Sequence, residues 1–84
     1  MTYSVFILRR AQRELAGLPI EVYLRVRDAI RELAQDPRPP GHLKLAGREG
    51  LRLRIGDYRV IYEVDDKQLI VTILHIGHRR DVYR

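Results

Sequence analysis

The sequence predicts an α+β domain in which an N-terminal strand and a helical hairpin pack on a small, largely antiparallel β-sheet. Between residues 9 and 35 the apolar residues recur with the helical period of about 3.6, and from residue 51 onward they recur with the strand period of two. A short strand-like run precedes the helical part. The expected order is therefore strand, helix, helix, strand, strand, strand.

The first half of the chain is expected to supply one strand and two helices. Residues 3–8 are apolar and rich in strand formers, and residues 9–18 carry an apolar stripe at helical spacing. Residues 19–35 form the second expected helix, which ends at Asp36 because a residue before proline avoids helical backbone angles. The expected inward side chains of the hairpin are Ala11, Leu15, Leu18, Tyr23, Val26, Ile30 and Leu33.

The second half is expected to form the rest of the sheet. Residues 42–50 are predicted to be a polar loop. Residues 51–55 and 58–64 alternate between apolar and polar, and Gly56-Asp57 between them suits a two-residue hairpin turn. Residues 69–76 are apolar at nearly every position, which is typical of a central strand covered on both faces.

The two histidines near the end of the chain receive separate interpretations. His75 is placed on the same side of its strand as Leu69, Val71 and Ile73, so we expect it to be packed in the core. The spacing His75-x-x-His78, with no cysteine and no suitably spaced carboxylate, predicts no metal site and no cofactor.

Length, cysteine content, hydropathy and charge limit the classes of protein to which the sequence can belong. The 84 residues predict a single domain, residues 1–84, and the absence of cysteine excludes disulfides and thiolate metal sites. No apolar stretch is long enough to span a bilayer and no signal peptide precedes residue 3, so no membrane association and a cytoplasmic location are expected. The net charge of +5 is concentrated in residues 9–18, 38–59 and 79–84, which suits either an anion-binding face or simple solubility.

Hairpin geometry predicts a cluster of arginines. If Gly56-Asp57 is the whole turn, Arg54 lies directly opposite Arg59 on the polar face, with Arg52 beside them. Like charges opposed across strands cost up to about 1 kcal/mol. A bound polyanion would explain their position; neutralisation by Glu63 or by an acidic helix residue is the alternative.

Several segments resemble the RelE/ParE superfamily of type II toxins. Residues 56–62 (GDYRVIY) and 76–84 (IGHRRDVYR) look like the two hallmark stretches of RelE-type toxins, and residues 43–47 (LKLAG) with the following strand fit the same pattern. The N-terminal spacing Ala11-x-x-x-Leu15-x-x-Leu18-Pro19 fits as well, so the resemblance covers essentially the whole chain. It implies the RelE-like fold.

The resemblance to the RelE-like branch implies an mRNA endonuclease that acts in the ribosomal A site. A ribose 2′-hydroxyl attacks the adjacent phosphate, which needs a base, charge stabilisation and an acid for the leaving oxygen. The residues that match the family's catalytic positions are Arg52, Arg54, Arg59, Arg79 and Tyr83. The further expected RNA contacts are Lys44, Arg48, His78, Arg80 and Arg84.

One departure from the family pattern concerns the general base. The best-known members carry lysines where this chain has Arg52 and Arg54, and arginine keeps its proton with a pKa above about 12. We therefore expect these two arginines and Arg59 to bind the phosphate. Arg79 is expected to lie near the leaving oxygen, and Tyr83 to stack on or orient a nucleobase of the RNA. The general base is left open, with His78 as a candidate because histidine is the side chain most often used as a general base near neutral pH.

The resemblance also implies partners and two alternatives. The expected partners are the ribosome, mRNA and a cognate antitoxin that folds on binding, with operator DNA contacted only through the antitoxin complex. The first alternative is a ParE-like, non-enzymatic poison of DNA gyrase. The second is an inactive relative that serves as an antitoxin-bound co-repressor.

Overall fold

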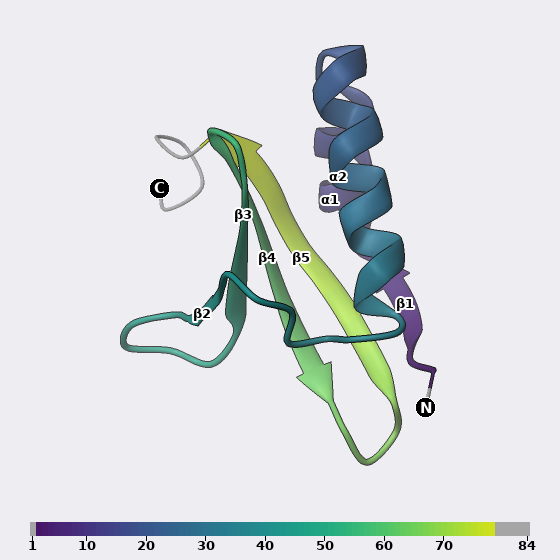
Figure 1. Ribbon diagram of the computed structural model, residues 1–84, viewed down its shortest axis with the longest axis vertical. Helices are drawn as coiled ribbons and strands as arrows, with labels where there is room; N and C mark the ends of the chain where they lie inside the picture. The colour runs from purple at the N-terminus through teal and green to yellow at the C-terminus, as the bar shows by residue number, and fades with distance from the viewer. Residues whose placement is uncertain (1, 79–84) are drawn as a thin grey trace.

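The computed structural model describes residues 2–78, and it has the predicted order of elements with one additional strand. A five-stranded sheet has the order β1-β5-β4-β3-β2, and both helices lie on one of its faces (Figure 1). β1 runs parallel to β5, and the other neighbours are antiparallel. The elements are β1 (Ser4–Ile7), α1 (Arg9–Ala16), α2 (Ile20–Leu33), β2 (His42–Lys44), β3 (Leu51–Ile55), β4 (Tyr58–Asp65) and β5 (Ile70–His78).

The helical hairpin buries most of the side chains that its periodicity predicts, but Tyr23 is only half-buried, and its neighbour Val22 packs against the core instead. Ala11 on α1 is fully buried, as are Val26 and Leu33 on α2, and they pack against the apolar residues of β3, β4 and β5. The chain leaves α2 at Leu33, three residues before Asp36. None of the helices within residues 2–78 is long and apolar enough to cross a membrane.

The segment after α2 is tied to the sheet by a buried hydrogen bond. The hydroxyl of Tyr62, a fully buried residue of β4, donates to the carbonyl oxygen of Pro37 at 2.7 Å. Burial raises the pKa of Tyr62 to about 12. This bond satisfies both polar groups away from water and fixes where the connector crosses the sheet.

The β3–β4 hairpin has the predicted register. Arg54 pairs with Arg59, and Arg52 pairs with Ile61. Gly56, the first residue of the turn, has a φ of +60°, which side chains other than glycine adopt only at a cost. The alternation of apolar and polar residues therefore predicts correctly which side chains of the two strands face the helices.

The prediction that residues 42–50 form a loop is wrong for its first three residues. His42–Lys44 form the edge strand β2, which pairs antiparallel with β3. Its stability comes from backbone pairing with β3, because the side chains of Leu43 and Lys44 are exposed. Three residues next to a Pro-Pro-Gly connector carry too short a pattern for sequence periodicity to detect.

The expected position of His75 is also wrong, because β5 contains a bulge. Tyr62 pairs with Ile73, but its neighbour Ile61 pairs with His75, so Leu74 is an extra residue in β5. The bulge reverses the alternation, and His75 joins Ile61 and Arg52 in the row that faces away from the helices.

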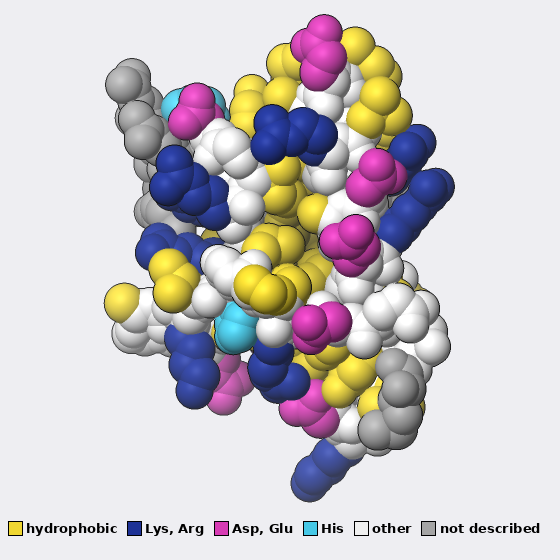
Figure 2. All heavy atoms as spheres, in the orientation of Figure 1, with side chains coloured by type: hydrophobic (Ala, Val, Ile, Leu, Met, Phe, Trp, Pro, Cys, Tyr) yellow, Lys and Arg dark blue, Asp and Glu magenta, His cyan; other side chains and the backbone are white. Residues whose placement is uncertain are grey.

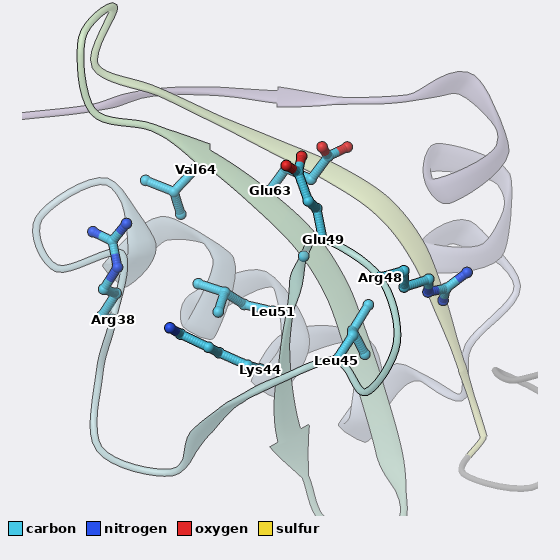
Figure 3. A pocket seen from close by; sticks show the side chains of 9 residues that line it. Arg38, Lys44, Leu45, Arg48, Glu49, Leu51, Glu63 and Val64 are labelled. Atoms are coloured by element: carbon cyan, nitrogen blue, oxygen red, sulfur yellow. The ribbon is translucent and has the colours of Figure 1, made fainter.

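The face of the sheet opposite the helices, here called the open face, is covered only in part, and its cover is a loop. Ile61 lies on the open face and is 2% exposed. The loop of residues 45–50 covers this region, since Leu45, Arg48 and Glu49 line a small cavity together with Ile61 and Leu74. Figure 3 shows this loop in front of β4, with the helices behind the sheet.

Candidate functional site

Three strands place the arginine cluster on the open face. Arg54 and Arg59 form one cross-strand row, and Gly77 of β5 continues this row. Arg52 begins the next row, which continues through Ile61 to His75. Because neighbouring strands lie about 4.8 Å apart, the three guanidinium groups belong to one small patch of surface. Gly77 leaves the β5 position of that patch without a side chain.

The contacts of Arg54 and Arg59 decide between the two explanations for this cluster. Arg54 Nε donates to the carbonyl oxygen of Gly56 at 3.0 Å, and an Nη of Arg59 donates to the carbonyl oxygen of Tyr58 at 3.4 Å. Among residues 2–78, no carboxylate forms an ion pair with either guanidinium, and Glu63 does not neutralise them. The positive charge of this row is therefore available to an anion.

The two other basic residues expected near the RNA lie at different places. Arg48 extends from the loop of residues 45–50 across β4 toward β5 (Figure 3). Lys44 pairs with Leu51, whose row faces the helices, so Lys44 lies apart from the arginine row. Figure 2 shows Lys and Arg side chains gathered on the side of the molecule that β2 and β3 form.

A cavity of about 470 Å³ joins Lys44 and Arg48 at the start of β3. Its other charged side chains are Arg38, Glu49 and Glu63, and its floor is formed by apolar residues such as Leu51. Figure 3 shows the carboxylates of Glu49 and Glu63 on the same side of this cavity. The mixture of signs separates this cavity from the uniformly basic arginine row.

The structure does not bring His78 to the arginine row. His78 pairs with Tyr58, and the two rings meet edge to face with centroids 5.5 Å apart. The row of Tyr58 faces the helices, so the imidazole of His78 lies on the side of the sheet opposite Arg54 and Arg59. The other expected site residues near the end of the chain, which are Arg79, Arg80, Tyr83 and Arg84, lie outside the described residues.

Sequence reasoning missed a contact between α1 and β5. Glu14 Oε1 accepts a hydrogen bond from the backbone N–H of Ile76 at 3.0 Å, and Glu14 Oε2 lies 2.5 Å from His75 Nδ1. Arg10, one helical turn earlier, approaches the same carboxylate at 3.5 Å. Glu14 and Ile76 are 62 residues apart in the sequence, so no local sequence motif indicates the contact.

A second cluster of charged groups fixes the opposite end of the sheet. Arg38 donates two hydrogen bonds to the carboxylate of Asp66, at 3.1 and 2.9 Å, and the hydroxyl of Tyr3 donates a third at 2.6 Å. The Arg38 bonds, followed by the Tyr3 bond, lower the pKa of Asp66, and the bond to Asp66 raises the pKa of Tyr3. The cluster ties β1, the connector and the β4–β5 turn together. Arg38 therefore has a carboxylate partner, which Arg54 lacks within residues 2–78.

Metal binding has no visible basis in the described part of the chain. Within residues 2–78, no three His, Asp or Glu side chains converge as ligands would.

Fold and motifs together assign the chain to a known class of proteins. Residues 5–83 match the family model described as the ParE toxin of type II toxin–antitoxin systems, and the chain belongs to the RelE/ParE toxin superfamily. It is a RelE-like toxin of a type II system. Toxin RelG of Mycobacterium tuberculosis is 35% identical, over 100% of this chain and 99% of RelG. Toxin RelE of the same organism is 37% identical, over 98% of this chain and 87% of that toxin.

Solved structures agree with this assignment and confirm the predicted RelE-like fold. The archaeal RelE–RelB complex from Pyrococcus horikoshii contains a chain that is 34% identical, with a TM-score of 0.84, over 98% of this chain and 100% of that one. The M. tuberculosis RelBE2 toxin–antitoxin complex contains one that is 31% identical, with a TM-score of 0.79, over 94% and 100% of the two chains. Both neighbours are complexes of a toxin with an antitoxin.

Proposed function

We propose that this toxin is an endoribonuclease that inhibits translation by cleaving mRNA. The observation that carries the proposal is the arginine row on the open face, where Arg54 and Arg59 oppose each other without a carboxylate partner within residues 2–78. A phosphodiester with two neighbouring phosphates is a polyanion that such a row would bind. The similarity to toxins named RelE and RelG supports the same activity.

The proposed reaction is the attack of a ribose 2′-oxygen on the adjacent phosphorus. The bond to the 5′-oxygen breaks, and the products are a 2′,3′-cyclic phosphate and a 5′-hydroxyl end. Arg52, Arg54 and Arg59 hold the phosphate and stabilise the charge that develops on its non-bridging oxygens. Arg79 would act near the leaving oxygen and Tyr83 would orient a base; these two roles rest on the family resemblance.

The proposed partners follow from the neighbours and from the charge of the site. The toxin binds mRNA in the A site of the ribosome, and Lys44, Arg48, Arg80 and Arg84 add contacts to RNA. A cognate antitoxin, as in the RelE–RelB complexes of the structural neighbours, keeps the toxin inactive. Operator DNA is contacted only through that complex.

Primer extension on a reporter transcript tests the proposed activity. After induction of the toxin, new 5′ ends should appear inside the translated region, and they should be absent with Arg59→Ala or Arg54→Ala. Loss of one donor to the developing charge should lower the cleavage rate about 100-fold. Arg31→Ala, which removes an exposed arginine of α2, is the matched control and should cleave normally.

A second candidate function is the poisoning of DNA gyrase without catalysis. It is favoured by one observation, the match of residues 5–83 to a family described as ParE toxin. The reporter experiment separates the two functions. Arrest of growth with intact mRNA and a loss of gyrase-dependent supercoiling would establish the gyrase target and exclude the ribonuclease.

A further inference from the structure

The open face carries an imidazole that the mechanism above does not use. His75 lies in the same row as Ile61 and Arg52, two strands from Arg52. At about 4.8 Å per strand, the Cα atoms of His75 and Arg52 are about 10 Å apart. A phosphate group above Ile61 would therefore lie within reach of both side chains.

A carboxylate holds the ring of His75 in place. Glu14 Oε2 lies 2.5 Å from His75 Nδ1, although the approach is outside ordinary hydrogen-bond angles. The other carboxylate oxygen of Glu14 accepts the backbone N–H of Ile76, so the carboxylate is itself fixed along the edge of β5. A carboxylate at Nδ1 favours the tautomer with the proton on Nδ1, which leaves Nε2 free to accept one.

The second ring nitrogen of His75 has no partner. Nε2 is enclosed and makes no hydrogen bond with any group in the described part of the chain. The ring lines a cavity of about 250 Å³, together with Ile61, Leu74 and Arg48. Buried polar atoms without partners are rare in folded proteins and need an explanation, and a ligand in the adjoining cavity would supply one.

We propose that His75, oriented by Glu14, is the general base that removes the proton from the attacking 2′-hydroxyl. This inference rests on the proposed ribonuclease function and supplies the base that the arginines cannot provide. The proton moves from the 2′-oxygen to Nε2 as the bond from that oxygen to phosphorus forms. The bond from phosphorus to the 5′-oxygen breaks, the 5′-oxygen takes a proton from water, and the proton on Nε2 then neutralises the hydroxide that remains.

The charged groups around His75 suit this role. From α1, Glu14 and Arg10 approach its Nδ1 side; the covering loop contributes Arg48 and Glu49, and β4 contributes Glu63. The Glu14 carboxylate stabilises the imidazolium formed in the reaction. The covering loop and the fold enclose Nε2, so RNA that enters the cavity takes the place of the loop contacts. Catalytic contacts commonly tighten only when substrate is bound.

Single-turnover cleavage of mRNA on programmed ribosomes by the purified toxin tests the inference, measured between about pH 5 and pH 8. The wild-type rate should fall toward acid pH, because a protonated imidazole cannot accept the proton. His75→Gln should lower the rate about 100-fold or more and abolish this acid limb. Added imidazole should restore part of the activity of His75→Ala.

Two further variants separate a catalytic role from a structural one. Glu14→Gln keeps an oxygen for the Ile76 N–H but loses the charge, so it should fold, retain partial activity and show its acid limb at lower pH. His42→Gln alters a histidine bonded to the Pro39 carbonyl oxygen, away from the arginine row, and should leave rate and pH profile unchanged.

The outcomes test the role of His75 separately from the proposed ribonuclease function on which it rests. A wild-type toxin that does not cleave RNA overturns both. A wild-type toxin that cleaves, with a His75→Gln variant that keeps the rate and the acid limb, overturns the role of His75 alone. If the His75 variants do not fold, as circular dichroism would show, the wild-type and Glu14→Gln profiles decide. A wild-type profile without an acid limb, or one that Glu14→Gln does not move, overturns the inference.

Discussion

Arg54 and Arg59 are directly paired across the β3–β4 hairpin, and each guanidinium donates to a backbone carbonyl oxygen of the hairpin itself. Opposed like charges on a sheet are destabilising by up to about 1 kcal/mol. No carboxylate within residues 2–78 offsets this repulsion. The pair therefore lowers stability in the free toxin and is favourable only when an anion is bound, which predicts opposite effects of one substitution on stability and on toxicity.

Arg59→Glu should stabilise the fold and abolish toxicity. The new carboxylate would face Arg54, which keeps its own bond to the Gly56 carbonyl, and an opposite-charge pair replaces a like-charge pair. The expected gain is about 0.5–1 kcal/mol, or a rise in Tm of about 2–8 °C, measured by thermal unfolding. Arg31→Glu on the exposed face of α2 is the control, with little change expected. A lower Tm for Arg59→Glu would contradict the repulsion.

Tyr62→Phe should destabilise the fold through a single lost hydrogen bond. The buried carbonyl of Pro37 would have no donor, which costs about 1–3 kcal/mol in urea unfolding. Tyr23→Phe is the matched control, because Tyr23 is half-buried and its hydroxyl makes no hydrogen bond within the described residues. Equal losses for the two variants would show that the Pro37 bond contributes nothing specific.

The same tyrosine predicts a loss of stability in alkali. In the unfolded chain Tyr62 ionises near its ordinary pKa of 10, whereas burial raises the pKa in the folded protein to about 12. The unfolded state is therefore favoured as pH rises from 10 toward 12, by on the order of 2 kcal/mol. The difference in unfolding free energy between wild type and Tyr62→Phe should shrink across this window; a constant difference would argue against the raised pKa.

The parts of the fold that were predictable are those in which side-chain patterning determines structure. Alternation in residues 51–64 determines the hairpin register, because a shift by one residue would expose Leu53 and Val60 and bury arginines. The bulge at Leu74 was not predictable, since residues 69–76 are apolar nearly throughout and alternation carries no information there. That bulge moves His75 to the open face.

The candidate site also has one part that was predictable from the sequence and one part that was not. The grouping of Arg52, Arg54 and Arg59 follows from local strand geometry and was predicted from sequence. The contact between Glu14 and His75 depends on where α1 packs along β5, beyond the last residue of β5 that pairs with β1. Such long-range packing is set by the whole core and leaves no local signature in the chain.

Asp66→Asn should lower stability at neutral pH and have no such effect in acid. Hydrogen bonds from Arg38, and then from Tyr3, lower the pKa of Asp66 below its ordinary 3.8. A lowered pKa stabilises the folded state at pH above the unfolded value, and this contribution is lost as pH falls through the folded value. The wild-type advantage in Tm should therefore be full at pH 7 and decline below about pH 4.

The control for this prediction is Asp28→Asn, which removes an exposed carboxylate that pairs only with its neighbour Arg27 within residues 2–78. It should change the Tm less than Asp66→Asn does, because exposed pairs between adjacent residues contribute little. If the Tm of the wild type exceeds that of Asp66→Asn by the same amount in acid, the effect comes from the packing of the side chain and not from its charge.

Gly50→Ala should destabilise the loop that covers the open face. Gly50 has a φ of +119°, and a Cβ there would lie 3.0 Å from Leu45 Cδ1 and 3.5 Å from the Tyr62 carbonyl oxygen. Backbone strain and the displaced Leu45 side chain should together cost about 2 kcal/mol or more in urea unfolding. Gly41→Ala is the matched control, since Gly41 also has a positive φ, +93°, but nothing within 4 Å of its Cβ. A cost for Gly50→Ala no larger than that for Gly41→Ala would show that the contact of Leu45 with this position does not hold the loop over Ile61.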